Sequence, residues 1–224
     1  MILSVHISKT AGRAFGQMLA AEWGARVLAD YGDWVGVNTP EAVTRRADRA
    51  ENARKNRQCL LRDYDIIHGH FIADKYVGLF PRTEFVGFFR DPYQQTISNY
   101  EFLLRNPQLD HPAVRELHET RMSLNDFIIR SANIQTQFIG SVRLENFVVI
   151  GLAEEFERSV ALFNATFGSN LTIQSTNVNP NRPNSGYEIE PGIMRLIDVH
   201  RAEDFALYRQ AKELFERQVS KRAL

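Results

Sequence analysis

A short polar turn near the start of the chain has the residue types that bind an anion. The apolar run of residues 2–8 has strand length and leads into Lys9-Thr10-Ala11-Gly12, after which residues 15–23 read as a helix. A strand, a tight turn and a helix point backbone N–H groups and the positive end of a helix dipole at one spot. Lys9 adds a full charge there, so we predict a phosphate-like ligand on this turn, with a purely structural turn as the alternative.

This turn differs from the phosphate loop of ordinary nucleoside triphosphatases. In the GxxxxGK[ST] pattern the lysine follows the glycines. Here Lys9 precedes Gly12, and this order argues against an ordinary nucleoside triphosphatase.

Arg90 and Ser98 form a second candidate anion site. Residues 84–90 are a continuous apolar run that ends at Arg90, as expected of a parallel strand buried on both faces. This strand delivers Arg90 to the carboxyl edge of the sheet, where open α/β sheets bind ligands. Asp91 and Pro92 then supply an N-cap and a first-turn proline. Ser98 lies about two turns into the helix that they start, where its hydroxyl can reach the same anion.

Two histidines share one face of another expected strand. In residues 65–71, alternation puts His68 and His70 on the same face, with Gly69 between them allowing another backbone to approach. An unperturbed histidine pKa of about 6.5 suits general-base chemistry near neutral pH. Two other interpretations stay open: a structural pair of hydrogen-bonded histidines, and a His-x-His metal chelate that lacks a clear third ligand.

The elements that must hold these residues indicate an α/β fold with a central, mostly parallel sheet and helices on both faces. Residues 147–152 are the last clear strand, and residues 111–140 and 191–224 are mainly helical. Residues 41–62 read as one helix with surplus basic charge, either a solvated face or a rim that attracts an anionic acceptor. The long polar segment 174–187 is typical of a functional lid or a mobile loop.

Whole-chain totals exclude several classes of protein. The 224 residues suit one domain spanning residues 1–224, and the zero net charge does not favour nucleic-acid binding. Cys59 is the only cysteine, which excludes an internal disulfide framework and a cysteine-rich zinc site. Because no basic leader or long apolar run is present, we expect a cytoplasmic protein without a membrane anchor.

Four blocks in this order resemble the sulfotransferases that use 3′-phosphoadenosine 5′-phosphosulfate (PAPS). They are most similar to the carbohydrate sulfotransferases of the heparan sulfate 2-O-sulfotransferase type and their bacterial relatives. The blocks are Ile7-Ser8-Lys9-Thr10-Ala11-Gly12, His68-Gly69-His70, Phe89-Arg90-Asp91-Pro92 with Ser98-Asn99-Tyr100, and Asn133-Ile134-Gln135-Thr136 with residues 149–156.

The resemblance implies a P-loop-like nucleotide-binding fold and in-line transfer of a sulfuryl group from PAPS to an acceptor hydroxyl, chiefly on a saccharide. It makes His70 the base, assisted by His68, and gives Lys9 the task of stabilising developing charge. No metal is required in this scheme. The residues implied in cofactor binding are Lys9, Thr10, Ala11, Gly12, Arg13 and Ala14 at the phosphosulfate, Arg90 and Ser98 at the 3′-phosphate, and Arg182 in a loop, residues 177–184, that closes over the nucleotide.

Departures from the family's loop keep other functions open. Ser8 stands where the family has proline, and Arg13 and Ala14 stand where it has hydroxyl side chains. A guanidinium suits phosphate geometry, so Arg13 either compensates for the missing hydroxyls or marks a changed ligand or lost activity. The alternatives are a catalytically silent module that binds PAPS, its bisphosphate product or a glycan, and an ATP-dependent kinase. The missing Walker order argues against the kinase.

Overall fold

The computed structural model describes residues 1–131, 133–173 and 186–223. In chain order the helices and strands are β1 (Ile2–Val5), α1 (Gly12–Trp23), the 3-10 helix η1 (Gly24–Arg26), β2 (Val27–Asp30), α2 (Pro40–Lys55), α3 (Arg57–Asp63), β3 (Ile66–Gly69), η2 (Ala73–Tyr76), β4 (Glu84–Phe89), α4 (Pro92–Arg105), α5 (Pro112–Glu119), α6 (Leu124–Arg130), α7 (Ile134–Ile139), η3 (Leu144–Asn146), β5 (Phe147–Leu152), α8 (Phe156–Phe167), α9 (Pro191–His200) and α10 (Ala202–Ser220).

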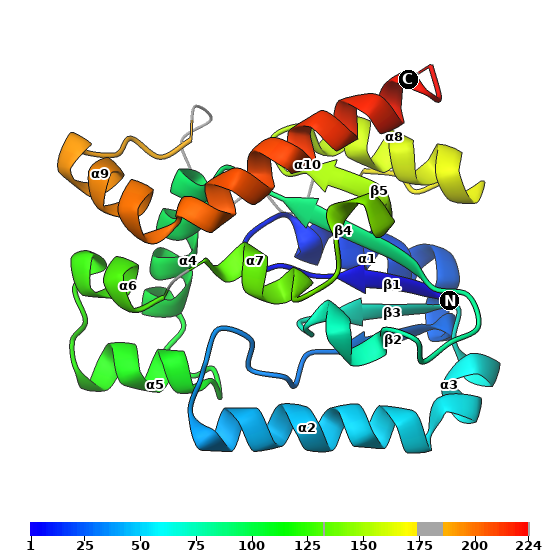
Figure 1. Cartoon of the computed structure of the whole chain (residues 1–224), viewed down its shortest axis with the longest axis horizontal. Helices are drawn as coiled ribbons and strands as arrows, with labels where there is room; N and C mark the ends of the chain where they lie inside the picture. The colour runs from blue at the N-terminus through cyan, green and yellow to red at the C-terminus, as the bar shows by residue number, and fades with distance from the viewer. Residues whose placement is uncertain (132, 174–185, 224) are drawn as a thin grey trace.

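The strands form a parallel sheet in the order β2-β3-β1-β4-β5 (Figure 1). β1 lies at the centre, with Ser4 paired to His68 of β3 on one side and to Val86 of β4 on the other. The carboxyl ends of all five strands therefore meet at one edge of the sheet. This confirms the predicted α/β fold with a parallel sheet and flanking helices.

Aromatic side chains join the sheet to the two helices on one of its faces. The ring of Phe15 on α1 lies 4.6 Å from that of Phe88 on β4 and 5.0 Å from that of Phe163 on α8, measured between centroids. All three side chains are buried, and burying each contributes on the order of 1.5–3 kcal/mol. α1 lies behind the sheet in Figure 1, whereas α7 and α10 lie in front of it.

α10 also satisfies the backbone of the edge strand β5. The side-chain amide of Gln218 donates to the carbonyl oxygen of Phe147 at 2.9 Å and accepts from the N–H of Ile150 at 2.9 Å. An unpaired strand edge is a site for unwanted pairing with another chain. Gln218 therefore satisfies one backbone donor and one backbone acceptor on this edge.

Two long predicted helices are wrong in their extent. The helix predicted for residues 41–62 is interrupted at Asn56, whose side chain bonds back to the carbonyl oxygen of Asn52 and so competes with helix continuation. The helical region 111–140 is three short helices. Arg121 and Asn133, at φ values of 50° and 38°, break it because left-handed residues end a right-handed helix.

The arginines of α2 hold the segment after β2 in place. Arg45 donates to the carbonyl oxygen of Gly32 at 2.5 Å and lies over the ring of Trp34, and Arg46 donates to the carbonyl oxygens of Trp34 and Val37. Arg49 contacts the carboxylates of Asp30, the last residue of β2, and Asp33, three residues later. These three guanidinium groups therefore support the segment after β2, whereas Arg54 of the same helix is exposed and pairs with Glu51, as on a solvated face.

The two aspartates belong to a buried ionic cluster. Lys75 donates to Asp30 at 2.6 Å and to Asp33 at 2.8 Å, and the hydroxyl of Tyr76 donates to Asp30 at 2.8 Å. Burial opposes ionisation of Asp30, but Lys75, Tyr76 and Arg49 outweigh it and lower the pKa of this carboxyl. The charged bonds fix the segment after β2 against η2 and α2.

Candidate functional site

The turn between β1 and α1 is strained and has an open helix N-terminus. Lys9 and Ala11 have φ values of 65° and 71°, in the left-handed region that side chains with a Cβ avoid. The Thr10 hydroxyl holds the turn by donating to the carbonyl oxygen of Ile7 at 2.9 Å. Ala11 is the N-cap of α1, and no side chain of the described residues caps the helix there. The first N–H groups of α1 are thus available to an anion.

Arg90 is fixed directly beside this turn. Its Nη1 donates to the carbonyl oxygen of Lys9 at 3.0 Å, and its own backbone N–H and carbonyl are both paired with the side-chain amide of Gln135. The predicted N-cap of α4 is present, since the Asp91 carboxylate accepts from the N–H of Gln94 at 3.1 Å. β4 and α4 therefore place Arg90 at the carboxyl edge of the sheet, next to Lys9.

α4 also brings Ser98 toward the turn. Gln95, in the first part of this helix, donates to the carbonyl oxygen of Ser8 at 3.0 Å, and Ser98 follows one turn later on a neighbouring surface of the helix. Ser98 is buried. The residues of the two predicted anion sites thus lie on elements that contact one another.

Positive charge gathers around Lys9. Burial, and after it the charges of Arg90, Arg105 and Arg13, lower the pKa of Lys9 to about 8. The Lys9 ammonium lies 4.3 Å from the ring centroid of Phe102 and has no carboxylate partner among the described residues. A buried cation beside other cations is unfavourable unless an anion compensates it. The residues present therefore fit a phosphate or sulfate group at this turn.

Three histidines lie together at the same edge. The ring of His6 stacks on that of His68 at 5.1 Å and meets the edge of His70 at 4.4 Å, between centroids. His6 follows β1, and His70 lies one residue beyond the end of β3. His6 is a site residue that the sequence analysis missed. Its alternation with Ser4, which puts both side chains on the face that carries His68, is the signal that identifies it.

Glycines of α1 make room for two of these rings. A Cβ at Gly12 would lie 2.0 Å from Cδ2 of His6, and a Cβ at Gly16 would lie 2.5 Å from Nε2 of His68. Each distance is shorter than any van der Waals contact. The imidazoles consequently pack directly on the helix backbone, close to the turn that carries Lys9.

The environments of His68 and His70 differ. Nδ1 of His68 shares a hydrogen bond of 2.9 Å with the hydroxyl of Ser4, so this ring is held between β1 and α1. Nε2 of His70 is buried without a hydrogen-bond partner among the described residues. Burial lowers the pKa of His68 to about 4, and burial followed by His68 and His111 lowers the pKa of His70 to about 3. Both rings are neutral near pH 7.

Comparison with solved structures supports the assignment of the fold. The chain is similar to a crystal structure of a sulfotransferase from Alicyclobacillus acidocaldarius, with a TM-score of 0.50 and 16% identity over 100% of this chain and 98% of that chain. The chain has a sulfotransferase-like fold. No protein-family model matches its sequence, and neither does any curated protein.

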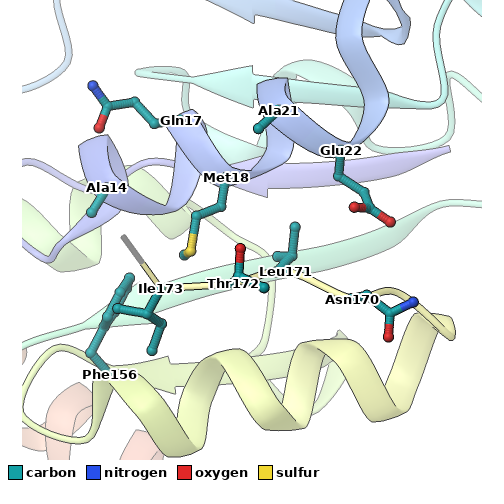
Figure 2. A pocket seen from close by; sticks show the side chains of 10 residues that line it. All are labelled: Ala14, Gln17, Met18, Ala21, Glu22, Phe156, Asn170, Leu171, Thr172 and Ile173. Atoms are coloured by element: carbon teal, nitrogen blue, oxygen red, sulfur yellow. The ribbon is translucent and has the colours of Figure 1, made fainter. Parts of the chain in front are cut away.

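In this sulfotransferase-like fold, a pocket of about 240 Å³ opens along α1 beside the turn (Figure 2). Met18 of α1 and Phe156 of α8 face each other across it, together with Ile173, and Gln17 and Glu22 supply polar groups at its rim. Ala14 lines the end nearest the start of α1. Apolar side chains from two sides, with polar groups between them, suit a flat organic ring that also carries hydrogen-bonding atoms.

Three expectations from the sequence concern a metal site, a membrane anchor and a closing loop. Among residues 1–131, 133–173 and 186–223, no group of three or more His, Cys, Asp or Glu side chains is arranged to hold a metal ion, and no helix there is long and apolar enough to cross a membrane. Arg182 and the predicted closing loop of residues 177–184 lie outside the described residues.

Proposed function

We propose that the protein transfers the sulfuryl group of PAPS to an acceptor hydroxyl, with a saccharide as the acceptor class. The observation that carries this proposal is the hydrogen bond from Arg90 to the turn that holds Lys9. It brings the two candidate anion-binding residues together at the edge of the sheet where the neutral histidines lie. PAPS has a phosphosulfate at one end and a second phosphate on its ribose. The two candidate sites lie on elements that contact each other, and this arrangement supports a ligand with two anionic ends.

Each anionic end has its own group of residues in this proposal. Lys9, Arg13 and the first backbone N–H groups of α1 would hold the 5′-phosphosulfate, with Thr10, Ala11, Gly12 and Ala14 forming the turn. Arg90 and Ser98 would hold the 3′-phosphate, because a guanidinium makes charge-assisted and often bidentate bonds to phosphate. The pocket along α1 would take the purine ring between Met18 and Phe156.

The chemistry requires one proton to leave the acceptor hydroxyl. The acceptor oxygen forms a bond to sulfur while the bond between sulfur and the bridging phosphate oxygen breaks, and the acceptor proton passes to Nε2 of His70. This nitrogen is buried without a partner in the described chain, and it is unprotonated near pH 7. Lys9 would stabilise the negative charge that develops on the bridging oxygen. His68, held by Ser4, would orient His70 rather than meet the acceptor.

The second candidate function is a silent binding module, because Arg13 and Ala14 stand where the family has hydroxyl side chains. Measured turnover distinguishes the enzyme from this module. The protein is incubated with ³⁵S-labelled PAPS and a panel of saccharide, phenol and peptide acceptors. Label in a saccharide product is the expected result. Tight binding of adenosine 3′,5′-bisphosphate without transfer to any acceptor would instead identify the silent module.

A further inference from the structure

Tyr31 links the buried histidine cluster to the protein surface. Its side chain is 46% exposed, whereas His6 and His68 are buried. Its ring centroid lies 4.9 Å from that of His70, 5.6 Å from that of His6 and 6.1 Å from that of His68. One aromatic ring therefore contacts all three imidazoles and still offers about half of its surface to solvent.

The Tyr31 hydroxyl is coupled to one of these imidazoles. It shares a hydrogen bond of 3.0 Å with Nδ1 of His6. Burial raises the pKa of Tyr31 to about 12, so the hydroxyl keeps its proton at neutral pH. A neutral imidazole has one donor and one acceptor nitrogen. The Tyr31 hydroxyl can donate to Nδ1 or accept from it, so the bond holds the His6 ring in place in either tautomer.

The backbone on both sides of Tyr31 is fixed by charged side chains. Asp30, directly before it, accepts from Lys75 and Tyr76 at 2.6 and 2.8 Å, and the carbonyl oxygen of Gly32, directly after it, accepts from Arg45 at 2.5 Å. Exposed aromatic residues on surface loops usually have mobile neighbours. Here two elements, α2 and η2, hold a half-exposed ring in one place, which is the arrangement expected of a preorganised binding group.

We propose that Tyr31 is the acceptor-positioning residue, with its ring forming a wall for the pyranose ring of a saccharide and its hydroxyl holding the His6 ring in place. This inference rests on the proposed function. The negative face of an aromatic ring attracts partly positive groups such as the C–H bonds on one face of a sugar. A sugar lying on Tyr31 would be next to His70, so one of its hydroxyls would reach the base.

A binding experiment tests this role without a known natural acceptor. Protein with ¹³C-labelled tyrosine rings is saturated with adenosine 3′,5′-bisphosphate and titrated with methyl β-D-glucopyranoside or with 4-nitrophenol. The Tyr31 signal is assigned by its loss in Tyr31→Phe. We expect the glucoside to shift the Tyr31 signal and to leave the signal of Tyr64, at the opposite edge of the sheet after α3, unchanged.

Variants separate the ring from the hydroxyl. Tyr31→Ala is expected to weaken glucoside binding about tenfold or more, which corresponds to about 1.4 kcal/mol. Tyr31→Phe keeps the ring, so it should bind the glucoside nearly as the native protein does but change the ¹⁵N signals of the His6 ring, which loses its hydroxyl partner at Nδ1. Tyr64→Ala is the matched control and should behave as the native protein does. Unchanged bisphosphate affinity shows that each variant is folded.

The outcomes distinguish this inference from the function on which it rests. If the bisphosphate binds but the glucoside neither shifts Tyr31 nor depends on it, the acceptor role of Tyr31 is overturned. A shift with 4-nitrophenol alone overturns the saccharide class. Unchanged His6 signals in Tyr31→Phe overturn the role of the hydroxyl in holding the His6 ring. Failure of the native protein to bind the bisphosphate overturns the proposed function itself.

Discussion

Nη1 of Arg90 donates a hydrogen bond of 3.0 Å to the backbone carbonyl oxygen of Lys9, although 81 residues separate the two in sequence. The contact holds the carboxyl end of β4 against the turn that follows β1. Because Gln135 fixes the backbone of Arg90 from the side of α7, three separate segments determine where its guanidinium lies. Arg90 thus has two tasks in the proposed site, to bind a phosphate and to support the turn.

Replacing Arg90 should reduce the preference for a nucleotide with a 3′-phosphate. The native protein is expected to bind adenosine 3′,5′-bisphosphate more tightly than AMP. Arg90→Ala should remove about 1.5–3 kcal/mol of the binding free energy of the bisphosphate, the usual contribution of a hydrogen bond to a charged group. Arg90→Lys should recover only part of it, since an ammonium lacks the planar fork of the guanidinium. Isothermal titration calorimetry measures each affinity.

Arg82→Ala is the matched control for Arg90. Arg82 is exposed and pairs with Glu84, at the opposite edge of the sheet. Its loss should leave nucleotide affinity unchanged. Equal affinity of the native protein for AMP and the bisphosphate would contradict a 3′-phosphate site at Arg90.

Lys9 should make nucleotide binding depend on pH above neutrality. The pKa of Lys9 is lowered to about 8 in the free protein, and a bound phosphosulfate or phosphate raises it by favouring the charged form. Binding at pH 8 should therefore take up about half a proton, and affinity should be full well below pH 8 and fall as the pH rises above it. Calorimetry in two buffers of different ionisation enthalpy measures the uptake.

Lys9→Met tests the source of this proton. The variant should bind more weakly and show no uptake at pH 8, and its affinity should be level across the range where the native protein loses affinity. Arg13→Met removes a neighbouring charge but no titrating group, so it should keep the uptake. Identical uptake in native protein and Lys9→Met would assign the proton to another group.

His70 and His68 should differ in their effects on turnover. His70→Ala is expected to lower kcat by about 10²–10⁴, the usual contribution of a positioned general base, and to leave bisphosphate affinity nearly unchanged. His68→Ala should lower the rate less, because its ring lies between β1 and α1 beside Ser4. Since the pKa of His70 is about 3, kcat/KM should not fall as the pH drops from 7 to about 5.

The reverse order of effects would show that the base is assigned to the wrong histidine. If His68→Ala abolishes turnover while His70→Ala retains most of it, His68 accepts the proton. If neither variant changes the rate, the cluster is structural and another group is the base. Labelled PAPS with any acceptor found in the panel provides the assay.

The strands and the start of α4 were predictable because their signals are local. The apolar run of residues 147–152 coincides with β5, the run of residues 84–90 is one residue longer than β4, and Asp91 with Pro92 defines the start of α4. Gly69 was expected to let another backbone approach, and this prediction is confirmed, since a Cβ there would lie 1.8 Å from the carbonyl oxygen of Asp30.

The histidine cluster was only partly predictable because it depends on contacts across the sheet. His6 is one polar residue in an apolar run, and its closeness to His70 follows from the pairing of β1 with β3, which the sequence does not state. Tyr31 has no local signal at all. In the sequence the arginines of α2 look like a basic surface. In the fold, Arg45 and Arg46 donate to carbonyl groups of the segment after β2, and Arg49 pairs with Asp33.

The neutral histidine cluster should make the fold sensitive to mild acid. Burial is the first cause that lowers the pKa of His6, His68 and His70, so the unfolded chain binds protons near pH 6.5 while the folded chain binds them only at lower pH. Wherever the unfolded state holds more protons, stability decreases as the pH falls. Each histidine should therefore cost about 1.4 kcal/mol of unfolding free energy per pH unit below 6.5.

Urea denaturation between pH 7.5 and pH 5.0 measures this loss, and His68→Asn isolates one member of the cluster. Its amide can still pair with the Ser4 hydroxyl but takes up no proton, so the variant should be less stable at pH 7.5 yet lose less stability on acidification. His200→Asn, at the end of α9 and outside the cluster, should keep the native slope. Asp30 does not account for the effect, because its lowered pKa places its own loss of stability at more acidic pH. A native protein whose unfolding free energy is the same at pH 7.5 and pH 5.0 would show that the cluster accepts protons without cost.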